Sequence, residues 1–263
     1  MAETPSAPAR CMTVVQKGTA GPPLYCFHAF GGTVAPYGEL APHIGRDRLV
    51  LGLESAGLSQ EESGDPAVLD MAHRYATEIA ADPPAGRSLF LGYSLGAVLA
   101  LEAARLLADL LDEPPLVVAV DGDPAYRSTG SDTAWSILTN QVLNVDLVTD
   151  GFSALPREAA LTEVRAAAAA QRRVPPRYPL ERLGRILDVC RHNEAAAAAY
   201  RPRPYPGPVL SIRSSDPAGG SSDAPDPWSP QISRLTVRRL PGDHQSIMSS
   251  AGYPALAALI RDL

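Results

Sequence analysis

The segment GYSLG, residues 92–96, places a serine in the pattern Gly-x-Ser-x-Gly. An apolar run over residues 88–93 precedes it and a helical pattern over residues 95–111 follows, which predicts a strand, a sharp turn and a helix. Such a turn exposes the serine hydroxyl beside the N–H groups of the helix N-terminus, which favour a developing oxyanion. We therefore predict that Ser94 is a nucleophile, against the alternative of a serine that only caps the helix.

A serine nucleophile needs a base at neutral pH, normally a histidine that is oriented by a carboxylate. His244 lies in the segment LPGDHQSIM, between the last predicted strand and the last predicted helix, where the base of such a triad is expected. His73 and His192 fall on predicted helices, and His43 lies near a helix end. We interpret these three as packing or solvated residues, so His244 is the predicted base.

Two aspartates compete for the role of the triad acid. Asp121 ends the strand that follows the nucleophile's own strand-helix unit, and Asp216 follows the next strand. Both stand at the carboxyl edge of the expected sheet, so position in the chain does not separate them. Asp123, in DGDP, is interpreted as a turn residue, and Asp223 and Asp226 as solvated loop acids.

Short apolar runs that alternate with helical patterns must position these residues. The predicted strands are 11–16, 23–28, 48–54, 88–93, 115–121, 208–213 and 234–240, and the predicted helices are 36–45, 67–81, 95–111 and 251–262. The middle strands are nearly continuous apolar runs, as expected where helices cover both faces of a sheet. The pattern predicts an α/β fold with a mostly parallel sheet and its site at the carboxyl ends of the strands.

One long segment breaks this alternation. From residue 127 to about 205 the chain shows two helical patterns, 158–174 and 180–201, and no good strand. We expect an inserted lid over the carboxyl edge of the sheet; the alternative is that these helices pack on the flank of the sheet. Residues 1–10 are expected to form a disordered leader and residues 11–263 a single domain, with a loop over 214–230.

The composition excludes several classes of protein. The 263 residues are 45% hydrophobic and 20% charged, as in ordinary globular proteins, and the net charge of -6 gives no footprint for nucleic acid or for an anionic membrane. No signal peptide and no run of 18 apolar residues occurs. Cys11, Cys26 and Cys190 are widely spaced, which favours a reducing compartment. We expect a soluble cytoplasmic protein with no metal site.

Four segments together resemble a known family: LYCFHAFGG, GYSLGA, VVAVDGDP and LPGDHQSIM. Over roughly residues 20–258 the chain is similar to the thioesterase domains that end nonribosomal peptide synthetase and polyketide synthase assembly lines. The resemblance implies an α/β-hydrolase fold with a helical lid between the family's sixth and seventh strands. It also implies a serine that accepts an acyl or peptidyl chain from a carrier protein.

The resemblance also assigns roles to individual residues. Chain-terminating members carry the acid just past the family's sixth strand, which implies Asp121, whereas editing (type II) thioesterases place it one strand later, which keeps Asp216 in reserve. The backbone N–H groups of Phe30 and Leu95 would form the oxyanion hole, and His28 would brace the turn before it. The chain departs from the family in two places. It has HAF where family members often have His-Pro followed by small residues, and it has GA where many members have two glycines after the elbow serine.

The implied activity is release of a chain from carrier-protein phosphopantetheine through a Ser94 acyl-enzyme, by hydrolysis or by cyclisation. It needs no bound cofactor, and the carrier would be linked in cis or supplied in trans. Arg172, Arg173 and Arg177 in the lid either dock this carrier or are solvated charges. The alternatives are a type II editing thioesterase, a general carboxylesterase and a non-catalytic binding module.

Overall fold

The computed structural model describes residues 10–59, 64–84, 86–128, 130–215, 225–261 and 263. Within them, seven strands form one sheet in the order β1-β3-β2-β4-β5-β6-β7. The strands are β1 (Met12–Gln16), β2 (Leu24–Phe27), β3 (Val50–Leu53), β4 (Leu89–Tyr93), β5 (Leu116–Val120), β6 (Tyr205–Ser215) and β7 (Ile232–Pro241). β1 pairs with β3 in an antiparallel sense, and the other pairs are parallel.

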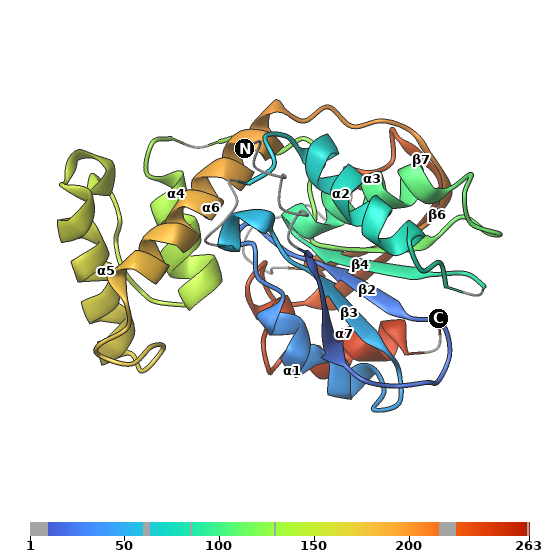
Figure 1. Ribbon diagram of the computed structural model, residues 1–263, viewed down its shortest axis with the longest axis horizontal. Coiled ribbons are helices and arrows are strands. Elements are labelled where there is room, and N and C mark those ends of the chain that lie inside the picture. The colour runs from blue at the N-terminus through green and yellow to red at the C-terminus, as the bar shows by residue number, and fades with distance from the viewer. Residues whose placement is uncertain (1–9, 60–63, 85, 129, 216–224, 262) are drawn as a thin grey trace, which may run out of the picture.

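Four helices cover the two faces of this sheet (Figure 1). α1 (Ala35–Ile44) and α7 (Tyr253–Ile260) lie on one face, and α2 (Val68–Ala80) and α3 (Leu95–Leu107) lie on the other. Alternate side chains of each strand enter the two cores, as the pleat of a strand requires. On β5, for example, Val117 packs with the α2–α3 core and Val118 with the α1–α7 core. This double coverage explains the continuous apolar runs in the sequence.

All seven predicted strands are present, but the last two are longer than predicted. β6 and β7 pair with one irregularity between Tyr205 and Pro208, and the register continues to Ser214 beside Leu240 and Ser215 beside Pro241. The prediction of a loop from residue 214 was therefore wrong at its start, because pairing with β7 holds these two serines in the sheet. Residues 216–224 of that loop lie outside the described residues.

The segment between β5 and β6 forms a helical lobe that extends beyond the sheet (Figure 1). It contains α4 (Thr133–Ser136), the π-helical turn η2 (Ile137–Leu143), the short turn η3 (Phe152–Ala154), α5 (Arg157–Ala170) and α6 (Leu180–Ala199). The sequence predicted the last two helices and missed α4 and η2. We call residues 127–205 the lid, because Gln141 and Ala197 from this lobe line the same cavity as Ser94. Its flanking strands are the fifth and sixth of the described chain.

Two further short 3-10 turns, η1 (Ala56–Leu58) and η4 (Ser246–Met248), follow β3 and β7. Among the described residues, no helix has the length and apolar character needed to cross a membrane.

Candidate active site

Ser94 occupies a strained turn between β4 and α3. Its φ of 55° and ψ of -121° are unusual for a residue other than glycine, and such strain is concentrated at functional sites. The Ser94 N–H donates to the carbonyl of Val120 on β5 at 2.9 Å, so the turn is tied to the neighbouring strand. A Cβ on Gly96 would lie 2.4 Å from the Phe27 carbonyl oxygen. Only glycine allows α3 to begin this close to β2.

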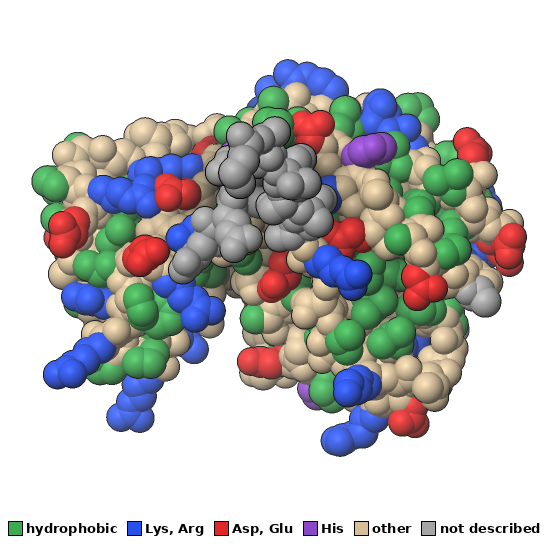
Figure 2. Space-filling model, viewed as in Figure 1, with side chains coloured by type: hydrophobic (Ala, Val, Ile, Leu, Met, Phe, Trp, Pro, Cys, Tyr) green, Lys and Arg blue, Asp and Glu red, His purple; other side chains and the backbone are tan. Residues whose placement is uncertain are grey.

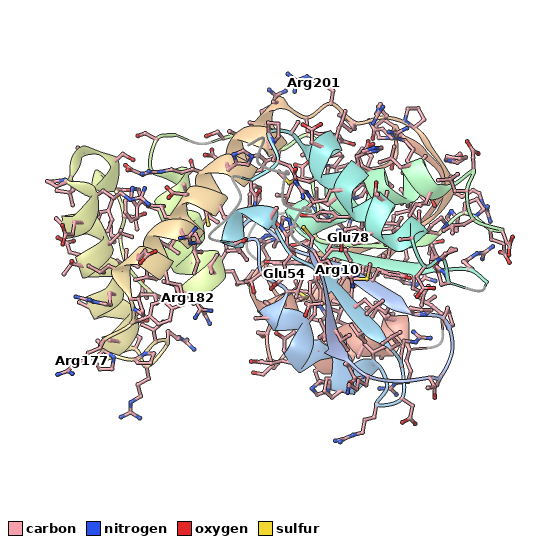
Figure 3. All side chains as sticks on the ribbon, viewed as in Figure 1. Arg10, Glu54, Glu78, Arg177, Arg182 and Arg201 are labelled. Atoms are coloured by element: carbon pink, nitrogen blue, oxygen red, sulfur yellow. The ribbon has the colours of Figure 1, made fainter. Side chains whose placement is uncertain are left out.

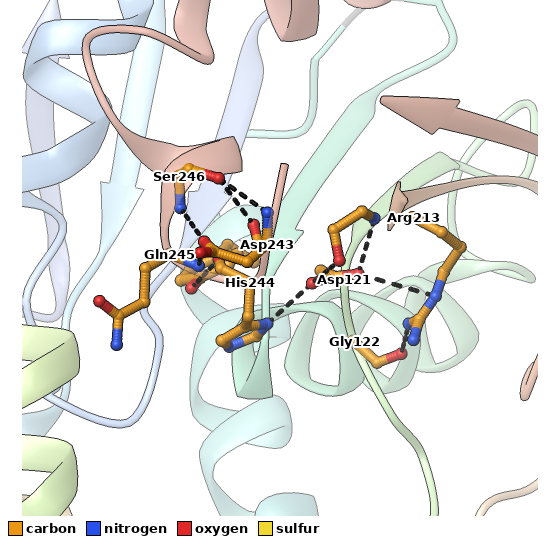
Figure 4. Close-up of polar contacts among 9 residues, drawn as sticks. Asp121, Gly122, Arg213, Asp243, His244, Gln245 and Ser246 are labelled. Carbon is orange, nitrogen blue, oxygen red and sulfur yellow. Dashed lines mark hydrogen bonds and ion pairs between the residues drawn. The ribbon is translucent and has the colours of Figure 1, made fainter. Parts of the chain in front are cut away.

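Asp121 and His244 form a hydrogen-bonded pair at the same edge of the sheet (Figure 4). The Nδ1 atom of His244 lies 2.9 Å from Oδ2 of Asp121, although 123 residues separate them in the chain. Asp121 also accepts hydrogen bonds from the Ser214 N–H at 3.0 Å and the Ser214 hydroxyl at 2.9 Å. Arg213 Nε lies 3.7 Å from Oδ1. Each of these groups faces a carboxylate that is almost fully buried.

Burial and the neighbouring polar groups act on the pKa of Asp121 in opposite directions. Burial alone would raise the pKa of this carboxyl group, because it disfavours the charged form. The hydrogen bonds from His244 and Ser214, together with the charge of Arg213, outweigh burial and lower the pKa to about 2. Asp121 is therefore ionised at neutral pH and accepts the Nδ1–H of the imidazole. That arrangement leaves the lone pair of the other imidazole nitrogen, Nε2, free to accept a proton.

Tyr93 holds the imidazole from a second side. Its ring stacks on His244 with centroids 4.7 Å apart and an angle of 28° between the planes, and its hydroxyl donates to the His244 carbonyl at 2.6 Å. Asp243 stiffens the turn that carries His244, because its Oδ1 accepts the N–H groups of Gln245 and Ser246 (Figure 4). The His244 imidazole is thus fixed by a strand end, a turn and an aromatic ring.

Ser94 and His244 line one cavity of about 250 Å³ at the carboxyl ends of the strands. Within the described part of the chain, no hydrogen bond joins the Ser94 hydroxyl to the imidazole. Catalytic hydrogen bonds are often long in free enzymes and shorten when substrate binds. The cavity wall is mainly apolar and includes Leu95, Val98 and Ala197. The space suits an acyl group that is attached to Ser94.

The loop over residues 28–32 carries Phe30, whose N–H is the predicted second oxyanion donor. His28 is completely buried, with Nδ1 2.7 Å from the Ala29 carbonyl oxygen and Nε2 2.7 Å from the Tyr75 hydroxyl. Because a carbonyl oxygen only accepts, Nδ1 donates and Nε2 accepts. Burial lowers the pKa of His28 to about 4, so the ring is neutral and braces the turn. The ring of Phe30 packs on Tyr126 with centroids 5.0 Å apart and lines the cavity.

A family model described as "Thioesterase domain" matches residues 22–263. The chain belongs to the thioesterase domain family. It is 28% identical over 192 residues to microperfuranone synthase of Emericella nidulans, an alignment that covers 70% of this chain and 20% of that protein. It is also 28% identical over 216 residues to a dimodular nonribosomal peptide synthase of Bacillus subtilis, with 80% and 9% covered. The thioesterase domain thus spans a fifth or less of these curated relatives.

The fold of the thioesterase domain is similar to that of the solved Vlm2 thioesterase domain. The TM-score is 0.71 at 22% identity, and the match covers 95% of this chain and 96% of that one. The predicted α/β-hydrolase fold class is confirmed by this match, and the predicted family is confirmed by the family model. The expectation of a thioesterase enzyme is confirmed with the family.

The remaining acidic candidates of the thioesterase domain have different surroundings. Asp216 and Asp223 lie outside the described residues. Asp123 accepts the Ala125 N–H at 2.8 Å and forms the predicted turn. The prediction of Asp226 as a solvated acid was wrong: it is 9% exposed and accepts the hydroxyl of Ser211 at 2.7 Å, because its loop folds back onto β6.

The other histidines of the thioesterase domain lie away from this cavity. His43 and His73 are exposed on helices, and His192 hydrogen-bonds the carbonyl of Asp65. No group of three or more histidine, cysteine, aspartate or glutamate side chains gathers as a metal site in the part of the chain that the structure describes. Cys11, Cys26 and Cys190 are buried, and no disulfide joins them.

The sequence prediction missed residues that support the site from neighbouring elements. Ser214 was placed in a loop, and the variable position of the elbow motif gave no sign that Tyr93 stacks on the base. Tyr200, at the end of α6, lines the cavity, and its hydroxyl donates to the fully buried Glu102 at 2.7 Å. The other oxygen of Glu102 lies 2.7 Å from Arg203 and 2.9 Å from Arg105. This cluster joins the end of the lid to α3.

A second cavity, of about 420 Å³, adjoins the first between the lid and the core. Phe30 and Gln141 line both cavities. The second cavity is more polar and includes Asn140 and Arg173 of the lid and Ser249 of the core. It gives the thioesterase domain a second, more polar space beside the cavity that contains Ser94.

Proposed function

We propose that this thioesterase domain takes an acyl or peptidyl chain from the phosphopantetheine thioester of a carrier protein onto Ser94 and then releases it. The observation that carries the proposal is the strained Ser94 in one cavity with the hydrogen-bonded pair of His244 and Asp121. The similarity to nonribosomal peptide synthases supports a carrier-bound substrate.

The first step forms the acyl-enzyme. As Oγ of Ser94 attacks the thioester carbonyl carbon, Nε2 of His244 accepts the hydroxyl proton. The C–S bond of the tetrahedral intermediate then breaks, and the pantetheine sulfur leaves with the proton from His244. Asp121 holds the useful tautomer and stabilises the imidazolium. The N–H groups of Leu95 and Phe30 receive the oxyanion, a contact whose loss costs roughly 10²–10³ in rate per donor in a comparable site.

The second step releases the chain. Water, or an amine or hydroxyl of the acyl chain itself, attacks the ester carbonyl while His244 accepts its proton and then returns it to the Ser94 oxygen. Water yields a free acid, whereas an internal nucleophile yields a ring. Exclusion of bulk water by the lid would favour a nucleophile that is carried in with the acyl chain.

The position of the acid favours chain release over editing. Asp121 follows β5 and precedes the lid, which is the arrangement that the family resemblance links to chain-terminating members. Its hydrogen bond to His244 supports Asp121 as the triad acid. An editing role in trans is the alternative outcome of the experiment below.

We propose that the carrier docks at the lid side and that its phosphopantetheine arm enters through the second cavity. Arg173 lines that cavity, and the neighbouring Arg172 and Arg177 are exposed. Figure 2 shows arginine side chains at the free end of the lid lobe, and Figure 3 shows Arg177 pointing away from it. An arginine at the cavity mouth suits a phosphate, and amide groups such as Asn140 suit the amides of the arm.

Charge reversal tests this docking site. The double change Arg172→Glu and Arg173→Glu should raise the KM for a carrier-bound thioester about tenfold and leave turnover of a small pantetheine thioester unchanged. Equal turnover of both substrates by the variant and the wild type would remove the docking role.

Intact-mass spectrometry tests the proposed function itself. The protein is mixed with acyl and peptidyl pantetheine thioesters, with Ser94→Ala as the control, and the products are analysed. We expect a mass increase of one acyl group on the wild type alone. Resolution to a ring supports a cyclase, and resolution to a free acid supports hydrolytic release or editing. Absence of both the adduct and thiol release would contradict the proposal, and activity only on simple esters would indicate a carboxylesterase.

A further inference from the structure

The loop that carries Phe30 is held by hydrogen bonds to three of its carbonyl groups. The Ala29 carbonyl accepts from His28 and from the Gly32 N–H at 3.0 Å. The Gly32 carbonyl accepts from the N–H of Ser55 at 2.8 Å. All of these donors belong to the core. The Phe30 carbonyl instead accepts from a side chain of the lid, at 2.9 Å, through Nδ2 of Asn193 on α6.

Asn193 is fully buried, and 163 residues separate it from Phe30. The direction of the contact follows from chemistry, because the opposite amide orientation would place two acceptor oxygens against each other. Its Oδ1 has no hydrogen-bond partner among the described residues. An unpaired buried oxygen lowers stability, so an apolar residue would serve packing better at this position. The hydrogen bond to Phe30 is the contact that packing alone does not explain.

The lid rests directly on the backbone of the same loop. A Cβ on Gly31 would lie 2.5 Å from a methyl group of Val142 in η2, and a Cβ on Gly32 would lie 2.7 Å from a methyl group of Val189 in α6. Both glycines therefore leave the space that these lid side chains fill. The side chains of Val142 and Val189 contact the loop backbone directly, so movement of the lid displaces the loop and movement of the loop displaces the lid.

We infer that Asn193 is a positioning residue through which the seated lid holds the Phe30 N–H in its oxyanion-binding orientation. The inference rests on the proposed function, which makes this N–H a donor to the tetrahedral intermediate. An oxyanion donor acts only when its hydrogen lies within a narrow range of the developing charge. The Phe30 N–H lies in the peptide plane of the Ala29 carbonyl, which His28 and Gly32 hold, and the Phe30 carbonyl lies in the next peptide plane. Asn193 fixes this second plane, so both planes that meet at the Phe30 Cα are held, and the second is held only while α6 is in place.

Two substitutions remove the donor in different ways. Asn193→Leu replaces the amide with an apolar group of similar size, and Asn193→Asp replaces it with an acceptor of nearly identical shape. Gln171→Leu is the matched control: the Gln171 side chain exchanges two hydrogen bonds with the backbone of Asp146, at 3.0 and 3.1 Å, entirely within the lid. The Gln171→Leu variant therefore alters the stability of the lid without removing a contact to the Phe30 loop.

Turnover of a small acyl pantetheine thioester is measured together with the binding of two probes. One is a boronic acid, which forms a tetrahedral adduct with a serine nucleophile, and the other is the free-acid product. For both Asn193 variants we expect kcat to fall on the order of tenfold to a hundredfold with KM within about twofold, a loss below that of deleting an oxyanion donor outright. Boronic-acid affinity should fall in step with kcat/KM, and product affinity should not change.

Circular dichroism and thermal melting establish that each variant is folded. Wild-type kcat in a folded Asn193→Leu protein would overturn the inference, as would an equal loss in Gln171→Leu. Parallel losses of boronic-acid and product affinity would also overturn it, because they indicate general damage to the cavity. Failure of the wild type to turn over any thioester would instead reject the proposed function, so the two failures are distinguishable.

Discussion

The carboxyl edge of the sheet and the lid both contribute to the site, but they position their residues by different means. At the sheet edge, Ser94 and Asp121 each follow the last residue of one of two paired strands, and the register of Tyr93 with Val120 brings them together. In the lid, Asn193 and Tyr200 reach the core through single side-chain hydrogen bonds. Backbone pairing therefore fixes Ser94 and Asp121, whereas side-chain contacts hold the lid.

This difference predicts different effects of substitutions at the sheet edge and in the lid. Loss of a residue at the sheet edge should abolish turnover and leave the fold intact. Loss of a lid contact should alter how firmly the lobe sits on the core and change the rate through that seating. The predictions below test this division, from the largest expected effect to the smallest.

Asp121→Asn should reduce kcat about 10⁴-fold, because an amide can hold the imidazole in the wrong tautomer. The side chain keeps its shape and still accepts from Ser214, so the melting temperature should change little. Steady-state kinetics on a pantetheine thioester measures the loss. Retention of more than a tenth of the wild-type kcat would assign the role of acid to another residue, with Asp216→Asn as the next variant.

Glu102→Leu should lower the free energy of unfolding by about 2–4 kcal/mol, because the buried Tyr200 hydroxyl loses its acceptor and the partly exposed Arg105 and Arg203 lose their partner. Urea denaturation measures this change. Tyr200→Phe is the milder companion, which removes one hydrogen bond to Glu102 and should lower the free energy of unfolding by about 1–3 kcal/mol. A loss below 1 kcal/mol in Glu102→Leu would show that the cluster does not anchor the lid.

Tyr93→Leu should lower kcat roughly tenfold, since an aromatic pair contributes about 0.5–1.5 kcal/mol and the stacked ring orients His244. Tyr93→Phe keeps the ring and loses only the hydrogen bond to the His244 carbonyl, so its kcat should lie between those of Tyr93→Leu and the wild type. Equal rates in the wild type and Tyr93→Leu would show that the stacking has no part in positioning the base.

Stability should decline as the pH falls from about 6.5 to about 4. Burial lowers the pKa of His28 to about 4 in the folded protein, against about 6.5 in an unfolded chain. The unfolded state binds more protons in this interval, so acid favours unfolding. Asp121, with a folded pKa of about 2 against 3.8, extends the decline below pH 4. Urea denaturation at several pH values measures it, and His28→Asn should flatten the upper interval only.

Much of the sheet and its edge could be predicted from sequence, because the information there is local. Each strand is a short apolar run, and each candidate at the edge follows such a run or starts a helix. The same logic failed at Ser214, since the length of β6 depends on pairing with β7 rather than on its own composition. It failed at Asp226 because the fold of a loop onto the sheet leaves no local pattern.

The lid could be predicted as helical but not as a source of contacts. Alanine-rich helices such as α5 and α6 have good helix propensity and weakly defined apolar faces. Nothing in the sequence around Asn193 distinguishes a buried donor from a polar residue on a solvated face. The contact with Phe30 depends on how α6 crosses the core, which periodicity does not specify. Three-dimensional packing alone brings these residues together.

The contact between Asp121 and Ser214 bears on how such a site can change during evolution. Ser214 stands on the strand next to Asp121, and its hydroxyl lies 2.9 Å from the carboxylate oxygen that holds the imidazole. A carboxylate introduced on β6 near this serine would arise beside an acid that is still working. The paired ends of β5 and β6 thus bring two positions of the chain to the same carboxylate oxygen that faces the imidazole.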